Sequence, residues 1–390
     1  MAGKSWQQLG FLFVFIAFIT ACKTTKVQES PKEKGTLVFH HQYVLPNHTK
    51  FEGIDIGGLS GIDYNADKQE YYMICDDRSD LAPARFYTGR VHINGYKIDS
   101  VSFIKSTTFK LPNGDTYPKR AVNPALTPDP EALRFDPTRR VFLWTSEGER
   151  TLEQPYAAIT DPSITAVDSS GNTQYNLPIP AQFEMSKEEK GPRRNGVFEG
   201  LAFTPDYKYC FVSCEEPLYG DSERADTIDQ KIYTRIIKYD LSTKMPIAQY
   251  LYPLSSVASI PNPKNGFRVN GVSDIMAINE NQIMVIERSF STGVKNNTIR
   301  VNLLDVSKAT DVSNIMELKK ATVGIDYKEP KVKALFTFDK IAGKVNMIDN
   351  VEGVTFGPVL PNGNRSLVFI VDNNFSDTEE TQFYLFEWKP

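Results

Sequence analysis

The sequence predicts an all-β protein, a five-bladed β-propeller built from four-stranded antiparallel blades. Three observations lead to this fold class. A short motif recurs five times, each repeat holds strand signal for four strands, and a spare strand precedes the first repeat while the last repeat lacks one. Recurrence at a near-constant period is typical of repeat architectures, and antiparallel four-stranded units repeated around an axis form propeller blades.

Each copy of the motif is a short apolar strand with a polar residue, followed by a turn and a second apolar strand that ends in an acid. The polar residues, spaced by 71, 68, 74 and 79 positions, are Ser60, Glu131, Glu199, Ser273 and Glu352. The acids that end the second strands are Asp76, Glu147, Glu215, Glu287 and Asp372. Because the motif recurs in both spacing and residue type, it favours a propeller over a β-sandwich with incidentally similar hairpins.

The strand patterns also indicate how the ring closes. The first repeat has strand signal over 59–64, 70–75, 85–93 and 101–111, with Asn, Asp, Gly or Pro between the runs. The fifth repeat supplies three strands, over 353–356, 367–371 and 382–388. We expect residues 36–45 to complete this last blade, because closure removes an exposed sheet edge. Six blades, one with a degenerate motif, are the alternative.

The N-terminal residues are predicted to form a targeting segment. In residues 1–21, Lys4 precedes an apolar run, and small residues lead directly to Cys22. This pattern resembles the bacterial lipobox, in which the cysteine is acylated and becomes the new N-terminus. We therefore expect a lipoprotein signal peptide, a polar tether over 22–35, and a propeller domain over 36–390. Acylation at Cys22 predicts an exported protein anchored to the lipid bilayer of a bacterial membrane, at its periplasmic face or at the cell surface.

Cysteine usage and charge exclude several classes of site. Besides Cys22, the chain has Cys75, Cys210 and Cys214, which we expect to be buried free thiols. The formal net charge is −4, and the chain has no basic run. Nucleic acid is therefore not an expected partner.

A ring brings equivalent positions of different blades together, so the repeated acids should gather at one mouth of the channel. Such a cluster requires compensation, because like charges raise each other's pKa. Calcium or another divalent cation could compensate the charge, because such ions bind carboxylate ligands. The arginines beside the motifs could compensate it instead. The predicted metal ligands are Glu131, Glu199, Glu352, Asp76, Glu147, Glu215, Glu287 and Asp372. A purely structural role for these acids and arginines stays equally open.

Other catalytic signatures are missing from the sequence. It has no Gly-x-Ser-x-Gly elbow, no His-Glu-x-x-His and no Walker-type loop. No histidine lies beside a repeat motif, so a Ser-His-Asp triad is not expected. Ser60 and Ser273 are interpreted as hydrogen-bonded channel residues rather than nucleophiles.

The motifs together resemble a known family, the phytase-like proteins described as "esterase-like activity of phytase". The resemblance spans about residues 55–375 and rests on ordered segments at 59–62, 75–79, 129–133, 195–202, 214–218, 285–290 and 350–354. It implies an exported β-propeller with phosphoester hydrolase activity. The calcium-dependent propeller phytases, with their acidic Ca²⁺ sites, are an analogy. The chain lacks the Lys/Arg enrichment expected for a ligand with six phosphates.

Two functional hypotheses follow. In the first, the protein is a metal-assisted phosphoesterase for a small anionic phosphoester, with Glu131, Glu199, Glu352 and Glu215 as catalytic candidates. Substrate binding would then fall to Arg78, Arg193 and Arg288, because guanidinium groups bind phosphate oxygens in a bidentate manner. In the second, the propeller is a non-catalytic module that binds a glycan, a peptide or a phosphorylated ligand, and the central acids are structural.

Overall fold

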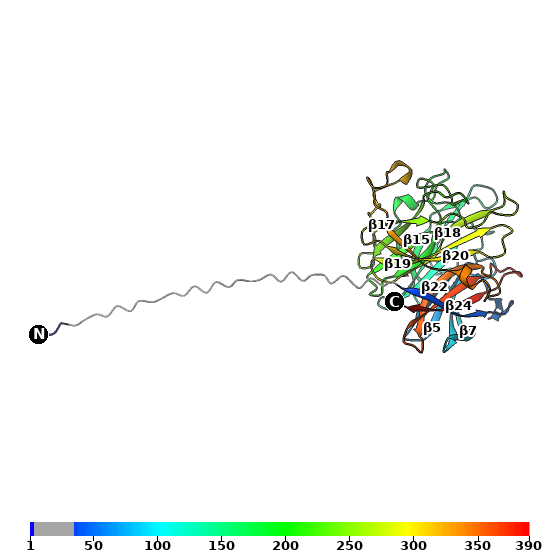
Figure 1. The fold of residues 1–390 in the computed structure, drawn as a ribbon, viewed down its shortest axis with the longest axis horizontal. Helices are drawn as coiled ribbons and strands as arrows, with labels where there is room; N and C mark the ends of the chain where they lie inside the picture. The colour runs from blue at the N-terminus through cyan, green and yellow to red at the C-terminus, as the bar shows by residue number, and fades with distance from the viewer. Residues whose placement is uncertain (4–34, 390) are drawn as a thin grey trace. The chain divides into compact units, whose positions relative to one another are not determined.

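The computed structural model describes residues 1–3 and 35–389; the targeting segment and Cys22 lie outside the described residues. The chain divides at Gly35, and residues 35–390 form one compact unit. This unit is a five-bladed β-propeller of antiparallel four-stranded sheets (Figure 1), as the sequence predicts. No helix among the described residues is long and apolar enough to cross a membrane.

The strands of the five blades follow the chain order. Blade one is β4 (Gly61–Asn65), β5 (Glu70–Cys75), β6 (Arg85–Asn94) and β7 (Lys97–Thr108). Blade two is β8 (Pro130–Asp136), β9 (Val141–Ser146), β12 (Ser163–Val167) and β13 (Thr173–Leu177). Blade three is β14 (Phe198–Phe203), β15 (Tyr209–Cys214), β16 (Ile232–Asp240) and β17 (Met245–Leu254). Blade four is β18 (Arg268–Ala277), β19 (Gln282–Ser291), β20 (Thr298–Asp305) and β21 (Lys331–Thr337).

Blade five confirms the predicted closure. It contains β22 (Asn350–Val359), β23 (Arg365–Asp372) and β24 (Gln382–Lys389), and its outer strand is β1 (Thr36–Val44). β1 and β24 are antiparallel and lie side by side in Figure 1. The first and last strands of the propeller therefore belong to one sheet. This pairing covers the edge of β24 and closes the ring of blades.

Short elements decorate the blades. They are the hairpins β2 (Lys50–Phe51) with β3 (Ile54–Asp55) and β10 (Glu149–Thr151) with β11 (Ala158–Thr160), and the 3-10 helices η1 (Ala181–Phe183), η2 (Leu318–Lys320) and η3 (Phe338–Ile341). The β10–β11 hairpin interrupts blade two between its second and third strands.

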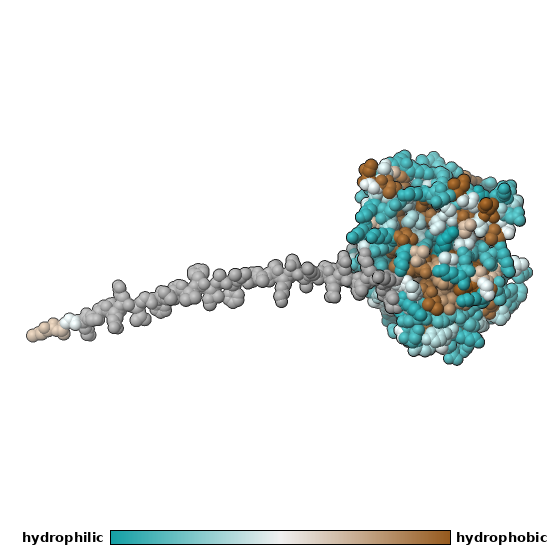
Figure 2. All heavy atoms as spheres, in the orientation of Figure 1, coloured by the Kyte–Doolittle hydropathy of each residue, from teal (hydrophilic) through white to brown (hydrophobic). Residues whose placement is uncertain are grey.

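The hydrophobic core lies between the blades. One buried cluster joins Phe86 of blade one to Trp144 of blade two, and another joins Met73 of blade one to Leu385 of blade five. Burial of each such large side chain stabilises the fold by about 1.5–3 kcal/mol. Cys75, Cys210 and Cys214 are buried free thiols in this core, as expected. On the outside, Figure 2 shows mostly polar side chains on the visible face, with apolar ones in separate patches.

The innermost strands approach one another closely where the repeat has glycine. A Cβ atom on Gly353 would lie 3.1 Å from Cα of Gly61 in the neighbouring blade. A Cβ atom on Gly61 would in turn lie 2.9 Å from the carbonyl oxygen of Glu131. Any side chain there would push two blades apart, which explains the glycine of the motif. The hydroxyl of Ser60 joins the same blades by donating to the Glu131 carbonyl over 2.8 Å.

Candidate functional site

In four of the five blades the polar residue of the motif lies on a β-bulge. In blade three, Phe198 pairs with Cys214 and Gly200 with Ser213, so Glu199 is the extra residue between two pairs. The same register shift occurs in blades two, four and five. A bulge turns a side chain away from the regular alternation of the strand. Glu131, Glu199 and Glu352 are thereby directed to one mouth of the channel, which we call the acid mouth.

In blades one, two, three and five the second motif acid lies at the end of its strand or just beyond it, at the same mouth. Glu215 follows β15, and the register of the other blades gives Asp76, Glu147 and Asp372 as its equivalents. In blade four the equivalent is Arg288, because Glu287 pairs with Val272 as Cys214 does with Phe198. Successive residues of a strand point to opposite sides, so this shift by one residue moves Glu287 away from the mouth.

The acid mouth contains a cavity of about 390 Å³. Its acidic lining residues are Asp76, Glu131, Glu147, Glu199, Glu215, Asp349, Glu352 and Glu379. Among the described residues that line it, Arg288 is the only cationic side chain. Eight carboxylates therefore face one guanidinium, which leaves a large negative charge for protons or cations to compensate.

Arg288 lies among three acids of the mouth. Its Nη2 is 3.1 Å from Oε1 of Glu215 and 3.7 Å from Oε1 of Glu352, and Nη1 donates to Oδ1 of Asn350. The pKa of Arg288 is raised by Glu352, Glu215 and Glu199, although burial alone would lower it. Its Nε–H is buried without a partner among the described residues. The acids of the mouth thus hold the guanidinium of Arg288 between them.

Burial and mutual repulsion raise the pKa values of the clustered acids. Burial is the larger cause for Glu131 and Glu199, and the neighbouring carboxylates add to it. The pKa of Glu352 rises to about 8 through burial, despite Arg288, and that of Asp372 to about 6. The raised pKa values mean that these carboxyl groups favour a bound proton or metal ion over an uncompensated negative charge.

The positions of the carboxylate oxygens fit a divalent cation. Glu147, Glu199 and Glu215 each offer an oxygen within 4.8 Å of the others, and Asp129, Glu131 and Glu147 form a second such group. Oxygen ligands lie about 2.3–2.6 Å from Ca²⁺, so two of them on one ion are at most about 5 Å apart.

A buried carboxylate at the same mouth also favours a bound cation. Asp372 is fully buried, and its Oδ2 finds no hydrogen-bond donor among the described residues. Its Oδ1 accepts the amide N–H of Asn374. The nearby Asp76 has its pKa raised by burial and then by Asp372 and Glu352. A buried carboxylate oxygen without a donor is costly, and a cation would satisfy it.

Four predicted residues do not line this cavity in the described structure: Asp372, Glu287, Arg193 and Arg78. Glu287 accepts hydrogen bonds from Tyr252, Asn270 and Asn302 between blades three and four. Arg193 donates to the carbonyls of Pro217 and Ser222 and stacks 4.2 Å from the ring centre of Tyr219.

Arg78 also takes part in a local ion-pair group. It contacts Asp129 at 3.1 Å and Glu149 at 2.9 Å. Asp129 belongs to the carboxylate group with Glu131 and Glu147. Through its contact with Asp129, Arg78 therefore lies next to the acid mouth without lining its cavity.

Several lining residues escape sequence reasoning. Asp349 and Glu379 belong to neither position of the motif, and they reach the cavity from loops beside β22 and β24. Asn195 and Asn350 line it as well. Their only local signal is proximity to a motif, because the path of a loop depends on tertiary packing.

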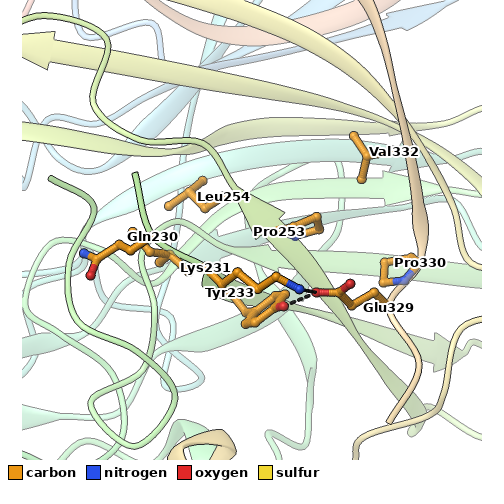
Figure 3. Close-up of a pocket in the computed structure, with 9 residues that line it drawn as sticks. Gln230, Lys231, Tyr233, Pro253, Leu254, Glu329, Pro330 and Val332 are labelled. Atoms are coloured by element: carbon orange, nitrogen blue, oxygen red, sulfur yellow. Dashed lines mark hydrogen bonds and ion pairs between the residues drawn. The ribbon is translucent and has the colours of Figure 1, made fainter. Parts of the chain in front are cut away.

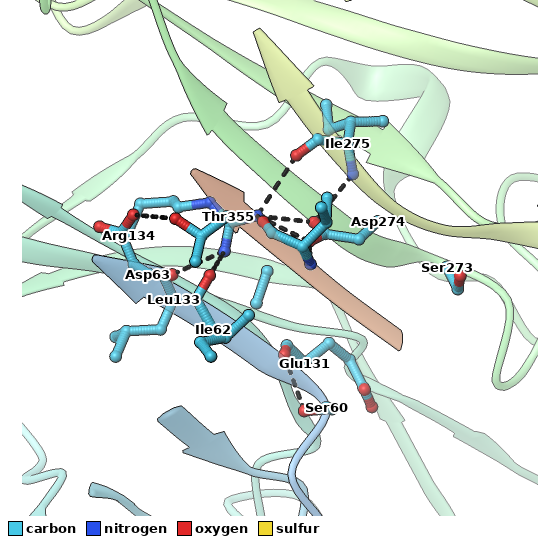
Figure 4. Close-up of polar contacts among 12 residues, drawn as sticks. Ser60, Ile62, Asp63, Glu131, Leu133, Arg134, Ser273, Asp274, Ile275 and Thr355 are labelled. Atoms are coloured by element: carbon cyan, nitrogen blue, oxygen red, sulfur yellow. Dashed lines mark hydrogen bonds and ion pairs between the residues drawn. The ribbon is translucent and has the colours of Figure 1, made fainter. Parts of the chain in front are cut away.

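A buried ion pair crosses the channel behind the acid mouth. Nη2 of Arg134, from blade two, bonds both carboxylate oxygens of Asp274 in blade four, and Nη1 donates to the carbonyl of Ile62 in blade one (Figure 4). Ser273 is also a channel residue, since its hydroxyl donates to the carbonyl of Val351. Neither serine of the motif is placed as a nucleophile.

A separate hollow of about 330 Å³ lies at the outer part of blade three, between Tyr233, Leu254 and Val332 (Figure 3). Its acid, Glu329, accepts a hydrogen bond from the hydroxyl of Tyr233 and pairs with Lys231 at 3.3 Å. The charges of this hollow are compensated within it, so we do not take it as the functional site.

The sequence was compared with known proteins. Residues 54–375 match the family described as "Phytase-like: Esterase-like activity of phytase". No curated protein matches the chain. Among solved structures, an endo-arabinase from Bacteroides thetaiotaomicron is 11% identical, with 84% of this chain and 93% of that chain covered and a TM-score of 0.41.

Two further solved structures have comparable likeness. An α-L-arabinofuranosidase from Lactobacillus brevis is 10% identical over 85% of this chain and 91% of that chain, with a TM-score of 0.41. The periplasmic gluconolactonase of Pseudomonas aeruginosa is 10% identical over 85% and 86%, with a TM-score of 0.35.

Proposed function

The chain belongs to the phytase-like family, and we propose that it is a metal-assisted phosphoester hydrolase that acts at the acid mouth. The observation that carries the proposal is the charge of the 390 Å³ cavity, where eight carboxylates face the single guanidinium of Arg288. Calcium, or another divalent cation, is the proposed cofactor. Glu147, Glu199 and Glu215 would hold it, with Glu131 and Asp129 as a second group.

The residues of the mouth divide into two roles. A bound divalent cation would supply Lewis acidity toward a phosphoryl oxygen. Arg288 would bind the phosphate, because it is the one cationic side chain among the described residues that line the cavity. The carboxylate of Glu131 accepts no hydrogen bond from the described part of the chain, so it can take up the proton of an attacking water. Glu215 and Glu352 are oriented by Arg288 and Asn350.

The same cavity limits the substrate. One guanidinium matches one phosphoryl group, and a volume of about 390 Å³ is at the small end of ligand sites, which span about 300–1,000 Å³. The proposed substrate is therefore a small phosphomonoester rather than a highly phosphorylated inositol.

The proposal extends to the location of the protein. We propose an exported lipoprotein held at the membrane by Cys22, a residue outside the described part of the chain. Thr36 pairs with Lys389 and Val44 with Gln382, and Gln382 pairs in turn with Val371 beside Asp372. The chain therefore enters the propeller at the face opposite the acid mouth.

Hydrolysis of p-nitrophenyl phosphate by the purified protein tests the activity. We expect turnover with calcium, loss of turnover with a chelator, and recovery when calcium is returned. Glu199→Gln should lower the rate about 10- to 100-fold, the scale of a disturbed metal centre. Glu287→Gln is the control, because this buried acid also belongs to the motif but lies outside the cavity.

Absence of turnover with every divalent cation and every phosphomonoester would contradict the enzyme proposal. The alternative would then hold, in which the propeller is a non-catalytic module for a glycan, a peptide or a phosphorylated ligand.

A further inference from the structure

A second cavity, of about 330 Å³, lies at the channel mouth opposite the acids. It is lined by the ends of the innermost strands and by the β14–β15 turn. Its aromatic lining residues are Tyr64, Phe135, Phe203, Tyr207 and Phe356, which together we call the aromatic cup. All five side chains are partly exposed. Rings that remain open to solvent around a hollow are available to a ligand.

The aromatic cup arises from the repeat itself. The register of the blades makes Tyr64, Phe203 and Phe356 equivalent, since each is three residues after the glycine of its motif. Phe135 has the corresponding place in blade two, and Ala277 in blade four. Four blades thus contribute a ring at the same level of the channel. The alanine of blade four leaves a gap on one side, through which a ligand wider than the channel can project.

The floor of the cup is polar. Asp63, which is partly exposed, accepts the amide N–H of Phe135 over 2.8 Å and faces the hydroxyl of Thr355 at 3.4 Å. Burial raises the pKa of Asp63, and Arg134 partly offsets this. Arg134 lies beside it in the ion pair with Asp274, visible in Figure 4. This ion pair separates the aromatic cup from the acid mouth.

The charges around the cup cancel. Asp63 and Asp274 are matched by Arg134 and by Arg365, whose guanidinium lies 3.7 Å from the ring centre of Phe356. A cationic ligand would meet the guanidinium groups of Arg134 and Arg365, and an anionic ligand would meet the carboxylate of Asp63, since Asp274 is buried behind the lining. A neutral ligand with an apolar face and hydroxyl edges meets neither penalty, because aromatic rings accept the face and charged groups hydrogen-bond the edges.

We propose that the aromatic cup binds a neutral sugar ring. The ring lies against Phe203 and Tyr207, while Asp63 accepts hydrogen bonds from its hydroxyls. Cavity size agrees, because about 330 Å³ is near the lower limit for small-molecule sites and suits a ligand of one or two rings. This site is independent of the phosphoesterase proposal, since it lies at the other mouth and shares no lining residue with the first cavity.

Saturation-transfer NMR with the full propeller tests the inference. The probes are glucose, galactose, mannose, N-acetylglucosamine, maltose and cellobiose, with tetramethylammonium as a cationic counter-probe. We expect saturable binding of at least one neutral sugar. Phe203→Leu keeps the apolar packing but removes the ring, and should weaken that binding about fivefold, the scale of one aromatic contact. Phe267→Ala, an exposed ring at the acid mouth, is the matched control and should leave it unchanged.

A second variant protects the test against a folding defect. Tyr207 has a φ of 54°, a conformation that Asn adopts readily, so Tyr207→Asn should fold and also weaken sugar binding. Melting curves verify both variants. The inference is overturned if no neutral sugar binds, if tetramethylammonium alone binds, or if folded Phe203→Leu and Tyr207→Asn bind sugar as the wild type does. The wild type, Phe203→Leu and Tyr207→Asn should hydrolyse p-nitrophenyl phosphate at the same rate. A failure of the sugar inference can therefore be distinguished from a failure of the phosphoesterase proposal.

Discussion

Arg134 and Asp274 join blades two and four across the channel, with Nη2 of the arginine 2.9 Å and 2.7 Å from the two carboxylate oxygens. Arg134 is 4% exposed and Asp274 1%. Asp274 stands where three other blades have glycine. Blades that are not neighbours are therefore held by one ion pair.

Removal of one partner of this pair should be strongly destabilising. Arg134→Met leaves a buried carboxylate without its cation, which costs about 3–5 kcal/mol in the free energy of unfolding. Urea denaturation of the variant and the wild type gives the difference. The double variant Arg134→Met/Asp274→Leu should recover most of the loss, because no charge is left uncompensated. A single variant as stable as the wild type would show that the ion pair does not hold the ring.

Ring closure by β1 predicts a sharp boundary for truncation. Removal of residues 1–34 should leave a folded, soluble propeller, because the compact unit begins at Gly35. Removal of residues 1–44 should reduce soluble yield severely, since it exposes the edge of β24 and takes Leu37 from the core. Size-exclusion chromatography of both truncations measures the difference. Equal yields of monomer would contradict the closure.

The fold could be predicted from the sequence because it repeats. Recurrent strands and an unmatched N-terminal strand are local signals, and closure of the ring follows from sheet-edge physics. The gathering of Glu131, Glu199 and Glu352 at one mouth could also be predicted, because a ring brings equivalent positions of different blades together.

The details of the site depend on register, which the sequence does not display. The sequence predicts that Glu287 joins the acids, but Glu287 pairs with Val272 as Cys214 pairs with Phe198, so Arg288 is the equivalent of Glu215. A shift of one residue in a strand reverses the side chain. Arg193 was predicted from its proximity to a motif, yet it holds the 217–222 loop through carbonyl groups. Asp349 and Glu379 arrive on loops, whose paths have no period.

The anchor proposal predicts the behaviour of a single cysteine variant. Cys22→Ser should move the protein from the membrane fraction to the soluble fraction and remove the mass of the acyl chains, because no other residue supplies them. The melting temperature of the propeller should not change. Fractionation and intact-mass spectrometry check this, and unchanged membrane retention with an unmodified mass would refute the lipobox reading.

Stability of the metal-free protein should fall as pH rises from about 4.5 to about 8. The native pKa of Glu352 is raised to about 8 and that of Asp372 to about 6. In this range the native state holds protons that the unfolded state has released, so raising the pH favours unfolding. Calcium should reverse the loss at the alkaline end and have little effect near pH 5, where protons occupy the carboxylates. Thermal melts with chelator and with calcium across this range give the two curves. Two superimposable curves would mean that arginines, not cations, compensate the acids.

Calcium titration of the metal-stripped protein by isothermal calorimetry tests the central claim most directly. At about pH 8 we predict saturable binding to the wild type and to Glu287→Gln, whose acid lies outside the cavity. Glu199→Gln should bind about tenfold more weakly or not at all, because it removes one charged ligand from the group with Glu147 and Glu215. Absence of binding to the wild type by calcium, magnesium or manganese, or equal binding by wild type and Glu199→Gln, would contradict the assignment of the acid mouth as a metal centre.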